Sequence, residues 1–214
     1  MYVPATPPTS PAVPLLAPVP ISSSASSSPI APAVDTALAV RRARLNVLAG
    51  ETASVAGALR PGLSGRVVAL QALGRRGWST LAQTRTGTGG RFRLRYVPRH
   101  TVSELVRLRF AGGPYDLASH RRLGRLDAYR LAEASWYGGG GSLACGGSLT
   151  SATLGVANKT LPCGTLVTLR YDGRSVRVPV IDRGPYVAGR EFDLTEATKR
   201  ALGFGDTGEV WSTL

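Results

Sequence analysis

The sequence is poor in the residues that build metal centres, redox sites and membrane spans. Its 214 residues include two cysteines, two histidines and one methionine. No stretch approaches the ~20 uninterrupted apolar residues of a membrane-spanning helix. No CxxC pair or histidine cluster offers zinc ligands. We therefore expect a protein with no membrane span, no metal and no other cofactor.

Lysine is nearly absent, whereas arginine is abundant. Residues 1–130 hold 18 Arg or Lys and 5 Asp or Glu, and residues 131–214 hold 8 of each, so the net charge of +13 lies entirely before residue 131. One interpretation is codon bias in a GC-rich genome. The other is attraction to a polyanion. Nucleic acid is the poorer candidate, because no helix-turn-helix, RNP or zinc motif is present.

The two cysteines, Cys145 and Cys163, are eighteen positions apart. A structural disulfide closing a loop of this size would contribute roughly 3 kcal/mol and would indicate an oxidising, exported location. Two buried free thiols are the alternative. Residues 1–38 are rich in Pro, Ser, Ala and Thr and predict a disordered linker. No signal peptide is visible, because a basic start is lacking and Pro18 and Pro20 interrupt the apolar stretch over residues 14–21.

Residues 39–113 have the pattern of a small β-sandwich. Short alternating runs are separated by Gly and Pro turns, as in residues 91–96, where Phe92, Leu94 and Tyr96 share one face. The predicted strands cover residues 45–47, 53–58, 67–72, 78–83, 91–96 and 105–110. This part of the chain resembles the immunoglobulin-like repeats of bacterial surface proteins. The resemblance is carried by Gly50 and residues 55–57, 61–62, 67–71, 77–78 and 90–92. Residues 114–131 are predicted to be a linker with helical character.

Residues 132–214 differ in sequence pattern from the residues before them. Strands are predicted over residues 134–138, 166–171, 174–181 and 210–213, with Asp172-Gly173 as a hairpin turn. Thr195 is a suitable N-cap for a short helix that Gly203 would end. The whole chain is therefore predicted to be all-β except for this helix.

Four motifs in this part carry a family resemblance. They are Ala134-Ser-Trp-Tyr-Gly138, Thr160-Leu-Pro-Cys-Gly-Thr165, Asp182-Arg-Gly-Pro-Tyr186 and Gly189-Arg-Glu-Phe-Asp-Leu194. Over about 80 residues they resemble the RlpA-type double-psi β-barrel family. The resemblance implies a six-stranded barrel, pairing of Cys145 with Cys163, and lytic transglycosylase activity on peptidoglycan strands.

The resemblance makes Asp182 and Asp193 the candidate catalytic residues. Non-hydrolytic cleavage of a glycosidic bond needs an acid for the leaving oxygen and a base for the attacking 6-hydroxyl. Its oxocarbenium-like transition state is stabilised by a nearby carboxylate. Asp182 precedes a Gly-Pro turn, where Arg183 could orient it bidentately. Asp193 lies between Phe192 and Leu194 and should point away from the core. The alternative is that each aspartate caps backbone N–H groups.

The candidate substrate-binding residues are Trp136, Tyr137, Asn158, Arg183 and Tyr186. Aromatic faces stack on sugars while their polar edges bind hydroxyls, and packing at the barrel end is the alternative for Trp136. The sequence departs from the family pattern at two positions, where Gly147 and Asn158 replace an expected Glu and His. Neither can transfer a proton near neutral pH.

Two functions therefore remain open. One is lytic transglycosylase-like cleavage with Asp182 as acid and base, and the other is an expansin-like module that binds or loosens glycan without cleaving it. A wall-anchoring adaptor that binds through the sandwich is a third possibility. We expect a secreted or cell-wall-associated monomer that binds peptidoglycan, does not bind nucleic acid, and has an Arg-rich sandwich suited to anionic wall polymers.

Overall fold

In this computed structural model the described residues are 32–214, so residues 1–31 of the predicted linker lie outside them. The part that is described is built of strands, with one α-helix and one short 3-10 turn. The first strands are β1 (Ala37–Arg44), β2 (Asn46–Leu48), β3 (Ala53–Arg60), β4 (Val67–Gly74), β5 (Gly77–Arg85), β6 (Arg91–Tyr96) and β7 (Val102–Phe110), with the 3-10 turn at Thr88–Gly90. All six strands predicted over residues 45–110 are confirmed.

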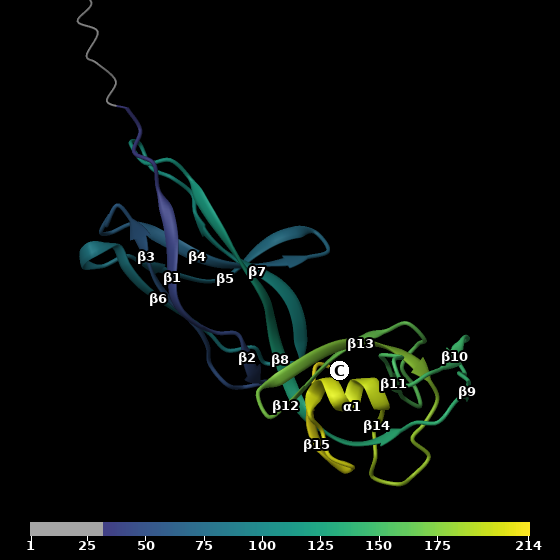
Figure 1. The fold of residues 1–214 in the computed structure, drawn as a ribbon. Coiled ribbons are helices and arrows are strands. Elements are labelled where there is room, and N and C mark those ends of the chain that lie inside the picture. The colour runs from purple at the N-terminus through teal and green to yellow at the C-terminus, as the bar shows by residue number, and fades with distance from the viewer. Residues whose placement is uncertain (1–31) are drawn as a thin grey trace, which may run out of the picture. The chain divides into compact units, whose positions relative to one another are not determined.

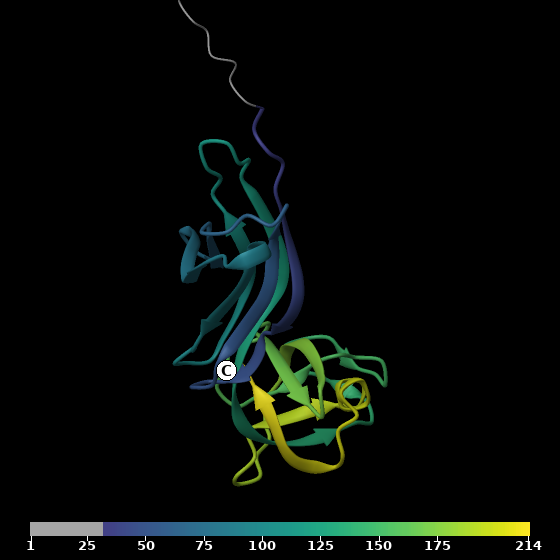
Figure 2. The same cartoon turned by 90° about the vertical axis from the view of Figure 1, so that its left-hand side faces the viewer.

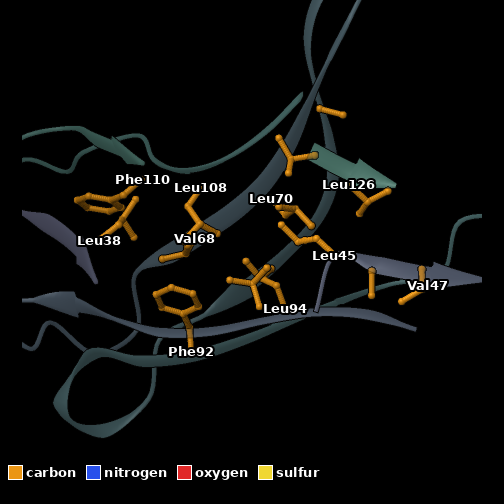
Figure 3. Close-up of a cluster of buried hydrophobic side chains, with 14 of the residues drawn as sticks. Leu38, Leu45, Val47, Val68, Leu70, Phe92, Leu94, Leu108, Phe110 and Leu126 are labelled. Atoms are coloured by element: carbon orange, nitrogen blue, oxygen red, sulfur yellow. The ribbon is translucent and has the colours of Figure 1, made fainter. Parts of the chain in front are cut away.

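These strands form two sheets around one core. The first sheet has the order β1-β3-β6, and in the second β8 (Ser119–Tyr137) is followed by β7, β4 and β5, while β2 pairs with β8 in parallel. Side chains alternate between core and solvent along β3 and β6, as a strand requires. Figure 3 shows side chains from both sheets meeting in this core, among them Phe92 and Leu94 from β6 and Leu70 and Leu108 from β4 and β7. The immunoglobulin-like class of this sandwich stays a prediction.

The predicted linker with helical character over residues 114–131 is corrected by the structure. From Ser119 onward the chain is strand β8, paired antiparallel with β7 from Ser119 to Ala128. The prediction failed because the polar, Arg-rich composition of this segment hides a strand, and pairing with the preceding strand β7 overrides local composition. Since β8 continues to Tyr137 and joins both parts of the fold, the proposed domain boundaries at residues 113 and 131 stay a prediction.

The second half of β8 belongs to a closed six-stranded barrel (Figures 1 and 2). The other strands are β11 (Val156–Ala157), β12 (Leu166–Tyr171), β13 (Arg174–Asp182), β14 (Phe192–Thr195) and β15 (Thr207–Ser212). Their order is β14-β11-β13-β12-β15-β8, and a parallel β14–β8 pairing closes the ring. A small hairpin of β9 (Gly141–Ser142) and β10 (Ser148–Leu149) stands apart from this ring.

The barrel interior is apolar, and the predicted helix lies beside it. Fully buried side chains fill the interior: Val156, Val167, Leu169, Val180, Phe192, Leu194, Leu202 and Val210. Helix α1 (Glu196–Leu202) starts at Thr195, whose hydroxyl accepts from the Thr198 amide, and ends at Gly203 with a left-handed φ of 68°. Both predicted caps are confirmed. No helix among the described residues is long and apolar enough to cross a membrane.

Candidate functional site

A β-bulge places Asp182 at the end of β13. Val156 of β11 pairs with Val180, but the next residue, Ala157, pairs with Asp182, so Ile181 is an extra residue on β13. Val180 is fully buried in the core, whereas Asp182 is half-buried. Because a bulge changes the direction in which the following side chains point, it turns Asp182 away from the apolar interior.

Backbone N–H groups hold the Asp182 carboxylate. Its Oδ1 accepts from the amide of Ala144 at 2.9 Å and from the amide of Arg183 at 2.9 Å. Its Oδ2 has no hydrogen bond to any residue in the range 32–214. The carboxylate is thus oriented by backbone donors through one of its two oxygens.

Asp193 lies on the same level of the barrel wall. Ala157 of β11 pairs with Asp182 of β13 on one side and with Asp193 of β14 on the other. Asp193 in turn pairs with Ser135 of β8. Neighbouring strands are ~4.8 Å apart, which puts the backbones of the two aspartates roughly 10 Å apart. Asp193 accepts a hydrogen bond from the Ser135 hydroxyl. It points away from the buried Phe192 and Leu194, as the sequence predicted.

Tyr137 brings a hydroxyl to these carboxylates. It follows Ser135 by two positions on β8 and therefore shares its face of the sheet. The hydroxyl is buried and makes no hydrogen bond of good geometry among residues 32–214, although the Asp182 carboxylate is near enough to act as its acceptor. Burial, then the charge of Asp182 and its hydrogen bond with the phenol, and last the charge of Asp193 raise the pKa of Tyr137. The phenol is therefore neutral at physiological pH and keeps a proton that it can donate.

Asn158 and Arg183 build the frame around Asp182 instead of facing a ligand. Asn158 is 4% exposed, its Nδ2 donates to the Glu191 carbonyl, and its Oδ1 accepts from two backbone amides in the following turn. The guanidinium of Arg183 donates to the carbonyls of Asn158 and Leu161. The predicted bidentate contact of Arg183 with Asp182 is therefore wrong. The carbonyls of the nearby turn take the guanidinium donors instead.

The predicted disulfide is present and forms part of the same frame. Cys145 is bonded to Cys163, and the Arg183 guanidinium donates to the Cys163 sulfur at 3.1 Å. The amide of Cys145 donates to the Ile181 carbonyl at 3.2 Å. Since Ala144 directly precedes Cys145, the disulfide holds in place the loop whose amide binds Asp182.

The two remaining aromatic candidates lie in different surroundings. Tyr186 follows the Gly184-Pro185 turn and is 82% exposed, so its face is free. The Trp136 indole donates to Asp206 at 2.9 Å, and the Lys199 ammonium lies 3.8 Å from the ring centroid. Trp136 alternates with Ser135 and Tyr137 along β8 and points to the other face. The structure thus brings Tyr137 to the carboxylates but not Trp136.

Gly147 stands where the family pattern has a carboxylate. Its φ is +82°, and a Cβ built there would meet nothing within 4 Å. The position is exposed, with open space but a backbone that L side chains rarely adopt. No group of three or more His, Cys, Asp or Glu residues that could hold a metal ion occurs in the described part of the chain.

Two contributors to the site went unnoticed in the sequence. They are the Ala144 amide and the Ser135 hydroxyl. A backbone donor leaves no trace in residue type. Ser135 does lie within the quoted motif at residues 134–138, but only the parallel β14–β8 register shows that it faces Asp193.

This fold and site define a class of protein: a small closed β-barrel with two aspartates on neighbouring parts of its outer face. Residues 131–211 match the family model described as lytic transglycolase. The chain is 44% identical over 87 residues to a probable endolytic peptidoglycan transglycosylase RlpA of Aquifex aeolicus, covering 38% of each chain. It is 39% identical over 87 residues to the endolytic peptidoglycan transglycosylase RlpA of Pseudomonas aeruginosa strain PAO1, covering 38% of this chain and 25% of the relative.

Residues 131–211 belong to the RlpA-like double-psi β-barrel family. The chain spans little more than a third, or less, of the length of these relatives. Among solved structures, the Streptomyces papain inhibitor is 25% identical over 39% of this chain and 91% of its own, with a TM-score of 0.33, too low to support an argument.

Proposed function

We propose that the barrel acts on the glycan strands of peptidoglycan by lytic transglycosylase-like cleavage, with Asp182 as acid and base. The observation that supports this most strongly is the row of Ser135, Asp193 and Asp182 on one face of the barrel, with the buried hydroxyl of Tyr137 beside it. The names of the relatives, endolytic peptidoglycan transglycosylases, favour the same substrate.

The reaction assigns a task to each group. The 6-hydroxyl of a muramic residue attacks its own C1, the bond from C1 to the departing O4 breaks, and the proton of the hydroxyl ends on O4. The free Oδ2 of Asp182 accepts the proton and returns it to the leaving oxygen. Asp193 supplies the negative charge that stabilises an oxocarbenium-like centre. The neutral hydroxyl of Tyr137 donates a hydrogen bond to a substrate oxygen.

Binding would use the exposed Tyr186 and the hydroxyl of Tyr137. Asn158 and Arg183 then serve as positioning residues, since their polar atoms already hold the turn around Asp182. The second candidate function is expansin-like binding without cleavage. The glycine at position 147 and the fully engaged amide of Asn158 favour it, because neither can carry a proton.

Mass spectrometry of denuded peptidoglycan strands incubated with the protein separates the two candidates. Cleavage produces 1,6-anhydromuramic ends, and Asp182→Asn should lower their rate of formation by about 10²–10⁴-fold. The asparagine keeps the Oδ1 that accepts from Ala144, so the loop should remain in place. Asp172→Asn, in the left-handed hairpin turn away from the site, is the matched control and should leave the rate unchanged.

Strand binding in a pull-down without any new anhydro ends would establish the non-catalytic module instead. With either outcome we propose a protein that is exported and wall-associated, in keeping with its disulfide. It is a monomer that does not bind nucleic acid. Its Arg-rich sandwich contacts anionic wall polymers.

A further inference from the structure

The sandwich surface has three arginine-lined hollows. The first, of about 530 Å³, is lined by Arg41 of β1, Arg91 and Arg93 of β6 and Arg85 of β5, with Ala56 among its other lining residues. The second, of about 400 Å³, is lined by Arg66, Arg85 and Arg109. The third, of about 100 Å³, is lined by Arg107, Arg109 and His120.

Neighbouring hollows share a lining arginine. Arg85 lines both the first and the second, and Arg109 lines both the second and the third. Strands β5 and β6 are the edge strands of their sheets, so the path passes from the β1-β3-β6 sheet around an edge to the β4-β7 face. We call this path the basic track, formed by Arg41, Arg93, Arg91, Arg85, Arg66, Arg109 and Arg107.

The charge of the track is almost uncompensated. No Asp or Glu lines any of the three hollows, and among the track arginines only Arg66 has an ion pair in the described chain, with Asp116 at 2.6 Å. Burial, and then the charges of Arg109 and Arg122, lower the pKa of Arg107. By contrast, one of the two hollows that Arg170 lines, on the barrel, also contains Asp172 and Glu209. A cluster of like charges without counter-charges in the protein indicates a binding site for an external anion.

We propose that the basic track binds a linear phosphodiester polymer of the bacterial cell wall. Guanidinium forks bind phosphate oxygens bidentately, and a row of them matches a chain with one charge per repeat. The small side chain of Ala56 between β1 and β6 leaves room for a chain to lie between the arginines of these strands. The wall setting follows from the proposed function of the barrel, but binding to the track does not depend on that function.

The shape of the track favours this occupant over two others. A path that turns around a sheet edge needs a flexible chain. A phosphodiester-linked polyol is flexible, whereas a polymer of linked uronic acid rings is stiff. Single-stranded nucleic acid would need aromatic stacking platforms. Phe92 and Phe110 line the hollows but are 6% and 2% exposed, and Arg107 covers the Trp78 ring at 4.1 Å.

Binding of fluorescent poly(glycerol phosphate) to the full chain tests the proposal, with polygalacturonate and oligo(dT) of equal charge as competitors. Arg85→Gln/Arg109→Gln removes both residues that join the hollows. It should weaken binding about tenfold and reduce the slope of log K against log salt by about 1.4, or ~0.7 for each lost phosphate contact. Arg75→Gln/Arg76→Gln removes the same charge from the β4–β5 turn, outside the track, and should change affinity less than about twofold.

A second pair guards against a folding defect, because Arg85 also donates to the Gly65 carbonyl. Arg91 and Arg93 are exposed, and their side chains make no hydrogen bond within residues 32–214, so Arg91→Gln/Arg93→Gln should weaken binding without altering the thermal midpoint. Equal losses in the track and turn variants would overturn the proposal, since net charge alone would then explain binding. Tighter binding of oligo(dT) or polygalacturonate than of poly(glycerol phosphate) would overturn the assigned partner.

Discussion

The sandwich and the barrel share strand β8, yet they differ in where their polar and charged side chains lie. In the sandwich the positive charges stay outside, on strands whose other face is apolar, and few carboxylates accompany them. In the barrel, basic and acidic residues are equal in number. Three polar residues, Ser135, Asp193 and Asp182, lie side by side on its strands. A broad charged face suits a long polymer, whereas oriented groups at one point suit chemistry or recognition of a single sugar.

Two tyrosines on β8 present the same contrast on a small scale. Tyr129 is fully buried, donates to Asn46 Oδ1 at 2.7 Å and packs against Trp211 with ring centroids 5.7 Å apart. Tyr137, eight residues further on, has a buried hydroxyl that makes no hydrogen bond of good geometry in the described structure. A buried hydroxyl without a hydrogen bond costs about 1–3 kcal/mol. Stability therefore explains the first tyrosine, whereas the poorly bonded hydroxyl of the second fits the proposed role in glycan binding.

The largest predicted effect concerns the disulfide, which only the barrel has. Cys145→Ser/Cys163→Ser should lower the free energy of unfolding by about 3 kcal/mol, because the unfolded chain regains the freedom of an eighteen-residue loop. Hydrogen exchange should rise in β12 and β13, while β3 and β6 in the sandwich keep their protection. Urea unfolding with and without reductant measures the energy. An equal loss of protection in both regions would show that they unfold as one unit and would remove the contrast.

The second effect is pH-dependent and tests the strand that the two regions share. Burial, and then the charge of Asp127, raise the pKa of Tyr129 to about 12. Its unfolded value is about 10, so the stability it adds is complete below pH 10 and is lost as pH rises toward 12. Between pH 9 and pH 11 the loss for this one group is about 1.4 kcal/mol.

Tyr129→Phe isolates that loss, since phenylalanine does not titrate. The variant is expected to be less stable at pH 8, where the bond to Asn46 is missing, and less sensitive to alkali than the wild type. Urea unfolding followed by circular dichroism at several pH values gives both quantities. Tyr115→Phe is the matched control, because Tyr115 is 62% exposed and its replacement should leave the pH dependence unchanged. Parallel pH curves for Tyr129→Phe and the wild type would contradict the raised pKa.

Local patterns were enough to predict most strands and the caps of α1. The alternation around Phe92 and Leu94, the Asp172-Gly173 turn and the Thr195 cap each depend on neighbours in sequence, and the structure has all of them. The interval 114–131 was misjudged because β8 depends on a partner earlier in the chain. In the site, the aspartates could be found from their motifs. The role of Arg183 could not, because a side chain chooses among acceptors that only the folded turn brings together.

The smallest effect on stability is expected at Tyr137, and there it separates function from folding. Tyr137→Phe removes a hydroxyl that makes no hydrogen bond of good geometry within residues 32–214, so the free energy of unfolding should change by no more than about 1 kcal/mol. If the hydroxyl serves a glycan strand, strand affinity or the rate of cleavage should fall about tenfold in this same variant. Thermal unfolding and strand binding, measured on one preparation, give both values.

Ser135→Ala is the natural companion to that variant, because its hydroxyl donates to Asp193 and lies on the same face. Its loss should lower stability, since a half-buried carboxylate loses a donor. A variant that gains stability while losing binding identifies a group kept for a ligand, and one that loses both identifies a group that holds the site together. Should Tyr137→Phe lose stability as Ser135→Ala does, the hydroxyl of Tyr137 has a partner within the fold, and the contrast with Tyr129 disappears.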